Sequence, residues 1–197
     1  AKNKVLDIDL IAVNTDAKQL AIMQQAGVIP LQIGESLTKG RGTGGSLELG
    51  ESAAHADEEK IRNAMKGADL VFVTAGMGGG AGTGAAPVVA KIARELGILT
   101  IGVVTVPFSF EGARKKRLAN EGIVKMQAIM DALIAVHNDN LMKLPENRRM
   151  SLVQAFEAAD EILRQAIRCI AEMILTTGVI NVDFADVKAI MSDAGSA

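Results

Sequence analysis

The chain has 197 residues, of which 49% are hydrophobic and 22% are charged, with a formal net charge of −2. This composition is typical of an α/β protein with one core, or with one domain and part of a second. The balanced charge gives no reason to expect nucleic acid as a partner. No apolar run approaches the roughly 20 residues of a membrane span, and the N-terminus lacks a signal peptide, so we expect no membrane insertion and a cytoplasmic location.

The first part of the chain alternates short apolar runs with helical patterns. Asp16 is placed to cap a helix after the first strand. A long glycine-rich segment follows the second strand, and such a loop inside a domain is more often functional than a linker. The predicted elements are a strand over residues 8–14, a helix over 17–25, a strand over 29–33, a glycine-rich loop over 34–50 and an amphipathic helix over 52–65.

The stretch that organises the prediction is 70–87. Residues 70–73 read as a buried strand, residues 76–84 as a glycine loop, and residues 85–95 as a helix with Pro87 in its first turn. This order directs backbone N–H groups and the positive helix end toward an anion, and phosphate is the anion we expect. The loop is neither a Walker P-loop nor a dinucleotide fingerprint. A flexible surface turn is the alternative interpretation.

The second part continues the alternation of strands and helices. The strand over 98–106 is nearly all apolar, as expected if helices cover both of its faces. Right-handed crossovers would bring every strand-to-helix loop to one edge of a parallel sheet, where ligands bind. The further elements are a loop over 108–112, a helix over 113–130, a strand over 133–136, a short helix or turn over 138–143, and a long helix from the Ser151 and Gln154 capping box to about residue 176. Cys169 shares a helical face with Ile162, Ala166 and Ile170, so we expect a buried thiol.

The glycine loop GMGGGAGTG, followed by AAPVVA, resembles the signature loop of the tubulin/FtsZ GTPase family. The resemblance implies a Rossmann-like parallel sheet with flanking helices, followed by a long central helix. It further implies a partial GTP-binding domain over 1–150, the central helix over 151–177, and over 178–197 a catalytic loop and the start of a helix leading to a second domain. Nothing before Ile8 resembles the family's first strand and phosphate loop, so we expect a fragment that is weakly stable or aggregates alone.

Other segments also resemble the loops that surround the nucleotide in this family. The segment ending in FSFEG resembles TKPFxFEG, whose glutamate binds ribose, and TKGRGTGG resembles the loop over the γ-phosphate. Phe156 and Asp160 stand at i and i+4, where the resemblance implies ring stacking on guanine and acceptance of its N1 and N2 protons. The implied GTP or GDP ligands are Asn14, Asp16, Thr43, Gly44, Gly45, Gly78, Gly79, Gly80, Ala81, Gly82, Thr83, Glu111, Lys115, Asn138, Phe156 and Asp160.

Two of these positions depart from the family pattern. Ala81 stands where threonine is usual, which removes a hydroxyl, and Lys115 stands where arginine is usual, which keeps the charge without the planar bidentate geometry. Considered without the resemblance, Phe156 would be interpreted as a core residue, Thr43 as a solvated loop residue, and Arg114 to Arg117 as a solvated helix face.

Asn181, Asp183 and Asp186 resemble the family's NxDxxD loop. The resemblance implies that they complete the catalytic site of a neighbouring subunit, where the two carboxylates would orient water toward the γ-phosphate. Without it, the acids would be interpreted as a helix cap and a first-turn residue. The implied protein is a GTPase of the bacterial division ring that hydrolyses GTP on head-to-tail polymerisation, with Mg²⁺ neutralising phosphate charge, and the fragment alone is expected to be inactive. Division-ring partners would bind through other regions.

Two other functions fit parts of this pattern. A filament protein for partition with little or no GTPase activity would tolerate Ala81 and Lys115. A dehydrogenase that binds NAD would share the sheet pattern, but the chain lacks the dinucleotide fingerprint and a recognisable hydride-transfer acid and base.

Overall fold

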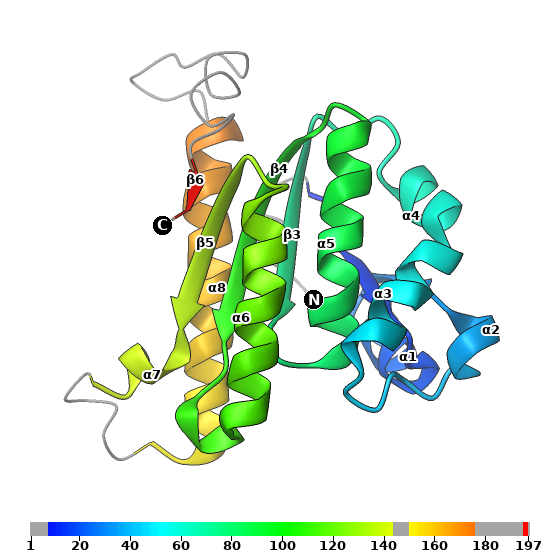
Figure 1. Cartoon of the computed structure of the whole chain (residues 1–197). Coiled ribbons are helices and arrows are strands. Elements are labelled where there is room, and N and C mark those ends of the chain that lie inside the picture. The colour runs from blue at the N-terminus through cyan, green and yellow to red at the C-terminus, as the bar shows by residue number, and fades with distance from the viewer. Residues whose placement is uncertain (1–7, 144–149, 176–194, 197) are drawn as a thin grey trace.

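The strands form two parallel sheets in the computed structural model, which describes residues 8–143, 150–175 and 195–196. In the first sheet β1 (Ile11–Asn14) pairs with β2 (Ile29–Gln32). The second has the order β3 (Leu70–Gly76), β4 (Leu99–Val106), β5 (Ala132–His137) and the short β6 (Gly195–Ser196). The predicted class, a parallel α/β fold with flanking helices, is confirmed (Figure 1).

The helices alternate with the strands along the chain. Most lie in connections between parallel strands, as the alternating pattern predicted. They are α1 (Ala17–Gln25), α2 (Glu35–Thr38), α3 (Leu47–Ala56), α4 (Glu58–Ala64), α5 (Gly80–Glu95), α6 (Ala113–Gln127), α7 (Asn138–Leu141) and α8 (Leu152–Leu175), with a 3-10 turn η1 (Ser109–Glu111) between β4 and α6.

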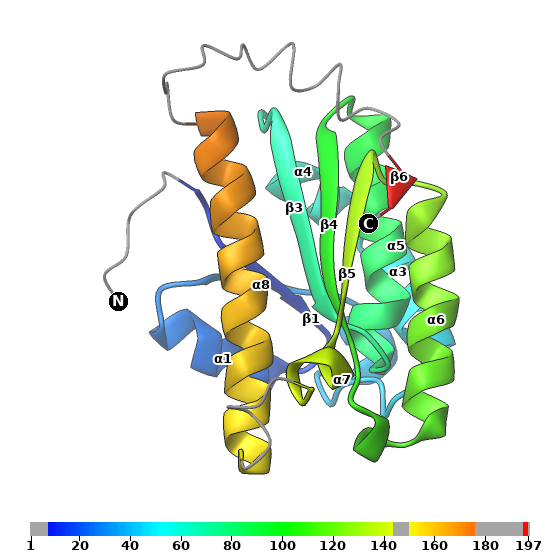
Figure 2. The ribbon, with the colours of Figure 1, turned by 90° about the vertical axis from the view of Figure 1, so that its left-hand side faces the viewer.

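Strand β4 is buried along its whole length between two layers of helices. On one face Val104 packs in a cluster with Ala90 of α5 and Met126 of α6. On the other face Ile101 packs in a cluster with Leu163 of α8, which crosses that face of the sheet (Figure 2). Helices thus cover both faces of β4, which is the reason that the sequence analysis gave for its apolar residues.

The glycine loop is shorter than predicted, because α5 begins at Gly80 rather than at residue 85. Pro87 consequently lies inside the helix and not in its first turn. Glycine disfavours a helix, but here close packing outweighs this preference. A Cβ atom on Gly84 would overlap the carbonyl oxygen of Leu47 in α3, and one on Gly50 of α3 would overlap that of Gly80.

The segment 34–65 also differs from the prediction. The expected continuous loop contains α2 and the start of α3, which is capped by Ser46, whose Oγ accepts the Leu49 N–H at 3.1 Å. The expected single helix over 52–65 is divided into α3 and α4 at Asp57. The Asp57 carboxylate accepts the Gly34 N–H at 2.7 Å, so a tertiary hydrogen bond holds the break.

The side-chain caps at the starts of α1 and α8 agree with the prediction. Asp16 Oδ1 accepts the N–H groups of Lys18 and Gln19 at the start of α1. Ser151 and Gln154 exchange the reciprocal hydrogen bonds of a capping box at the start of α8, and the structure describes this helix as far as Leu175. The expected burial of Cys169 is wrong: its side chain is exposed, because other residues of α8 make the contact with the sheet.

A cleft separates the two sheets. Among the described residues, β1 pairs only with β2, and β3 pairs only with β4, so one edge of each faces no strand. Apolar side chains of β1, β3 and α5 line the cleft, including Ile11, Val13, Val71, Ala85 and Val89. Its volume of about 160 Å³ is smaller than the roughly 300 Å³ at which ligand pockets begin, and its walls suit apolar side chains rather than a nucleotide.

We predict that Gly84→Ala destabilises the protein by about 2 kcal/mol. Overpacking against backbone costs about 1–3 kcal/mol and exceeds the helix propensity gained, which is up to about 1 kcal/mol. Urea unfolding would measure the loss. Gly76→Ala is the matched control, because a Cβ there meets only Thr105 Oγ1 at an ordinary 3.7 Å. An unchanged unfolding midpoint for Gly84→Ala would contradict the close packing of α3 and α5.

Candidate functional site

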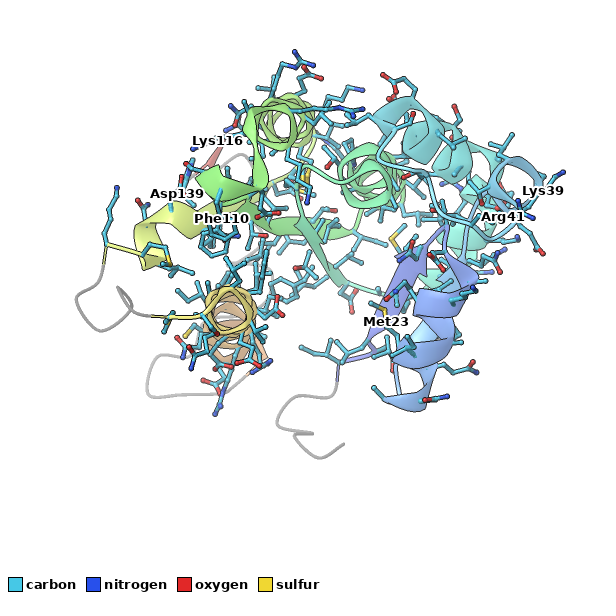
Figure 3. The ribbon with its side chains drawn as sticks, turned by 90° about the horizontal axis from the view of Figure 1, so that it is seen from below. Met23, Lys39, Arg41, Phe110, Lys116 and Asp139 are labelled. Atoms are coloured by element: carbon cyan, nitrogen blue, oxygen red, sulfur yellow. The ribbon has the colours of Figure 1, made fainter. Side chains whose placement is uncertain are left out.

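The loops that carry most of the predicted residues meet at the carboxyl edge of the sheet. Because β3, β4 and β5 are parallel, their ends at Gly76, Val106 and His137 lie at the same edge. The start of α5, the turn η1 and helix α7 follow directly from these three ends. Figure 3 shows this edge from below, with Phe110, Lys116 and Asp139 grouped on one side.

The start of α5 offers backbone donors. Gly79 is its N-cap residue, and no side chain caps the first turn. The N–H groups of this turn and the positive end of the helix are therefore arranged as the predicted anion site requires. The resemblance implied that Thr83 contacts the nucleotide. In the structure its side chain is fully buried, and its Oγ1 accepts a hydrogen bond from the Gly78 N–H at 2.7 Å. Thr83 thus shapes the loop.

The loop over residues 39–45 lies against the start of α5. A Cβ on Gly80 would overlap Thr43 Oγ1, which places the Thr43 hydroxyl beside the first turn of the helix. Gly44 and Gly45 adopt positive φ angles of 58° and 83°, which glycine adopts without strain. The structure therefore brings the predicted γ-phosphate loop to the predicted phosphate site.

Asn14 and Asp16 form the turn between β1 and α1. Asn14 Oδ1 accepts the Asp16 N–H at 3.1 Å, while Asp16 caps α1. The Ala17 N–H donates to Gly40 O at 3.2 Å, which ties this turn to the loop over 39–45. Both predicted residues thus lie beside the loop over residues 39–45, and their side-chain oxygens accept hydrogen bonds from backbone N–H groups of the turn and of the start of α1.

Glu111 closes the turn η1. Its Oε1 accepts the Phe108 N–H at 2.9 Å and its Oε2 accepts the Lys115 ammonium at 3.1 Å. A Cβ on Gly78 would lie only 2.8 Å from Lys115 O, so the glycine loop touches the start of α6. The predicted ribose-binding and phosphate-binding segments are therefore adjacent.

An aromatic cluster lies at the other end of the site. Phe110 stacks on Phe108 with ring centroids 4.8 Å apart, and Phe156 meets Phe108 edge to face at 5.5 Å. Phe156 is 43% exposed, so it is not the core residue that its sequence alone suggested, and Asp160 is exposed one turn further along α8. Phe110, 52% exposed, belongs to this surface although we assigned it no role; its place inside FSFEG was the available signal.

Asn138 begins α7 and is only 4% exposed. Its side-chain Oδ1 has no hydrogen-bond partner within the described residues. Buried polar atoms are rarely left unpaired in native proteins, so this acceptor fits a site that a ligand donor completes.

The predicted catalytic residues are not placed by the structure. Asn181, Asp183 and Asp186 lie outside the described residues. Where the chain is described, no three His, Cys, Asp or Glu side chains are grouped to hold a metal ion. In the same part of the chain, no helix is both long and apolar enough to cross a membrane.

Comparison with known proteins gives a consistent result. Residues 3–146 match the GTPase domain of the tubulin/FtsZ family. The structure of an empty FtsZ dimer from M. jannaschii is 43% identical over 94% of this chain and 53% of that chain, with a TM-score of 0.86. A protofilament of CetZ2 from Haloferax volcanii bound to GTPγS is 28% identical over 95% of this chain and 55% of that chain, with a TM-score of 0.77.

CetZ1 from Haloferax volcanii, a monomer bound to GDP, is 25% identical over 94% of this chain and 55% of that chain, with a TM-score of 0.74. The chain thus spans about half the length of each of these structures. The family match covers most of the chain, and the fold and the loop positions agree with it. This chain therefore belongs to the tubulin/FtsZ family, in its GTPase domain.

Proposed function

We propose that this chain binds GTP and GDP, assembles head to tail and hydrolyses GTP at the interface between subunits, as a protein of the bacterial division ring in the cytoplasm. One observation carries the proposal: the start of α5, Glu111 and the pair Phe156 and Asp160 follow one another along the carboxyl edge of the sheet. The similarity to a GTPγS-bound protofilament and to an FtsZ dimer supports nucleotide binding and self-association.

Each part of the nucleotide has a proposed partner. The N–H groups of Gly80, Ala81 and Gly82 would hold phosphate oxygens, since no side chain caps this helix start. Glu111 would accept the ribose hydroxyls with the oxygen lone pairs that its two internal contacts leave free. The exposed ring of Phe156 would stack on the base.

The base would be selected by Asp160 and Asn138. A carboxylate accepts the two donors at guanine N1 and N2, and adenine offers no such pair. The unpartnered Asn138 Oδ1 would supply a further acceptor for the base. Mg²⁺ would be held mainly through phosphate oxygens, as is usual for nucleotide complexes, because the described residues group no three acidic or histidine ligands. It would neutralise charge on the phosphates.

The catalytic step is assigned to Asn181, Asp183 and Asp186. The carboxylates of Asp183 and Asp186 would orient the attacking water toward the γ-phosphate bound in the next subunit. The proposed division of the chain is a partial GTP-binding domain over 1–150, the central helix over 151–177 and the catalytic segment over 178–197. One more parallel strand, which the resemblance implies for this domain, would fit between the open edges of β1 and β3.

The second candidate is a partition filament with weak hydrolysis. Ala81 supports it, because this partly exposed residue in the first turn of α5 offers no hydroxyl to a phosphate. Family membership removes the dehydrogenase alternative. The two filament functions differ in turnover per bound nucleotide.

We expect Asp160→Ala to weaken GTP binding by at least about 100-fold, because two charge-assisted hydrogen bonds are lost at about 1.5–3 kcal/mol each. Competition with ATP would show reduced discrimination between the bases. The control is Glu157→Ala, which removes an exposed carboxylate from the same helix and should leave GTP affinity unchanged. Equal GTP affinity in the parent and in Asp160→Ala would exclude Asp160 from the base site.

We expect GTP turnover per subunit in the full-length gene product to rise above a threshold protein concentration. Asp183→Ala and Asp186→Ala should abolish turnover while GTP still binds, and Asp193→Ala, an acid with no proposed role, should not. Mixing Asp183→Ala with Asp160→Ala subunits should restore part of the turnover, because a GTP-loaded site then meets an intact catalytic loop. Turnover that is independent of concentration, or an active Asp183→Ala, would contradict a shared site.

A further inference from the structure

A hydrogen-bonded cluster joins three elements beside the aromatic surface. Asp139 of α7 accepts the Ser109 N–H at 2.8 Å through Oδ1, and the Ser109 hydroxyl at 2.6 Å and the Lys116 ammonium at 2.9 Å through Oδ2. Lys116 also donates to Ser109 Oγ at 3.1 Å. We call these residues the Asp139 cluster; Figure 3 shows Asp139 and Lys116 together near Phe110. None of the three has a role in the site described above.

The cluster lies between two proposed nucleotide contacts. Ser109 stands in the same short turn as Glu111, and Glu111 closes that turn through the Phe108 N–H. Asp139 directly follows Asn138 in α7. The distance between the ribose-binding carboxylate and the base-binding amide therefore depends on the contact of Ser109 with Asp139.

The contact is strong for a surface group. The Asp139 side chain is 34% exposed, yet the hydroxyl and the N–H of Ser109, followed by Lys116, lower its pKa to about 2. A lowered pKa means that the contribution to stability is present above the ordinary pKa of about 3.9 and is lost only as the pH falls toward 2. At neutral pH the carboxylate is ionised and its hydrogen bonds are charge-assisted.

We propose that Asp139 is a positioning residue for the nucleoside half of a bound guanine nucleotide. By fastening η1 to α7, it holds Glu111 and Asn138 at the spacing at which ribose and base can be bound together. The inference rests on the proposed function, and it assigns Asp139 no contact with the ligand. The phosphate half is held separately by α5.

This separation gives the proposal a specific signature. Displacement of binding groups by about 1 Å can cost about 100-fold in function. Loss of the cluster should therefore weaken binding of a ligand that spans both η1 and α7. It should leave binding of the phosphate chain alone unchanged, and it should not alter the chemical step assigned to the neighbouring subunit.

The test is GTP binding and turnover by Asp139→Ala and Asp139→Asn in the full-length gene product, with inorganic tripolyphosphate as the second probe. We expect Asp139→Ala to raise Kd and KM for GTP about tenfold, with kcat at saturation within about twofold of the parent. Asp139→Asn keeps an acceptor for Ser109 N–H, so its loss should be smaller. Tripolyphosphate should bind all variants equally. Glu121→Ala, which removes an exposed ion pair from α6, is the control.

A double variant checks that the effect passes through Ser109. Ser109→Ala/Asp139→Ala should bind GTP no more weakly than Asp139→Ala alone, because Asp139→Ala already removes the hydrogen bond that the Ser109 hydroxyl donates. Thermal unfolding would verify that each variant folds. Parental GTP affinity in Asp139→Ala, or a loss that is equal for GTP and tripolyphosphate, would overturn the inference. If the parent itself fails to bind GTP, the proposed function is wrong and so is this inference.

Discussion

Helices α3 and α5 approach each other backbone to backbone, and the position of the phosphate site depends on this contact. Gly50 of α3 faces Gly80, and Gly84 of α5 faces the carbonyl of Leu47; at each position a Cβ atom would overlap main-chain atoms. Any larger residue would push the helices apart. The start of α5 and the loop over residues 39–45, which precedes α3, can therefore lie close together because these glycines have no side chains.

From this contact the site continues along the sheet edge through direct neighbours. Thr43 lies beside Gly80, Gly78 touches Lys115, and Lys115 pairs with Glu111. Phe108 then joins the turn η1 to Phe156 on α8. These contacts span the two ends at which phosphate and base would be bound. A displaced loop at one point would therefore change the spacing between groups that must bind a single ligand.

In the described part of the chain the two sheets, unlike helices α3 and α5, are not in direct contact along the facing edges of β1 and β3, which border a cleft. Strand β4 is buried on both faces, whereas β1 and β3 each leave one edge toward an apolar cleft. Unpaired edges and apolar walls are a favourable surface for another strand. The sequence analysis predicted a parallel sheet without a strand order, and the described residues form two parallel sheets, because the pattern of apolar runs specifies strands and not which strands become neighbours.

The sequence by itself determined the class of fold, the family, the capped ends of α1 and α8 and the apolar centre of the sheet. These features depend on local chemistry: a side chain that accepts nearby N–H groups, or a run of apolar residues with a period that fits one element. Only the tertiary structure decided that Gly80 to Gly84 are helical, that Asp57 divides α3 from α4, that Cys169 is exposed and that Asp139 joins Ser109 and Lys116. In each case the deciding partner lies on another element, and local preference contains no information about that partner.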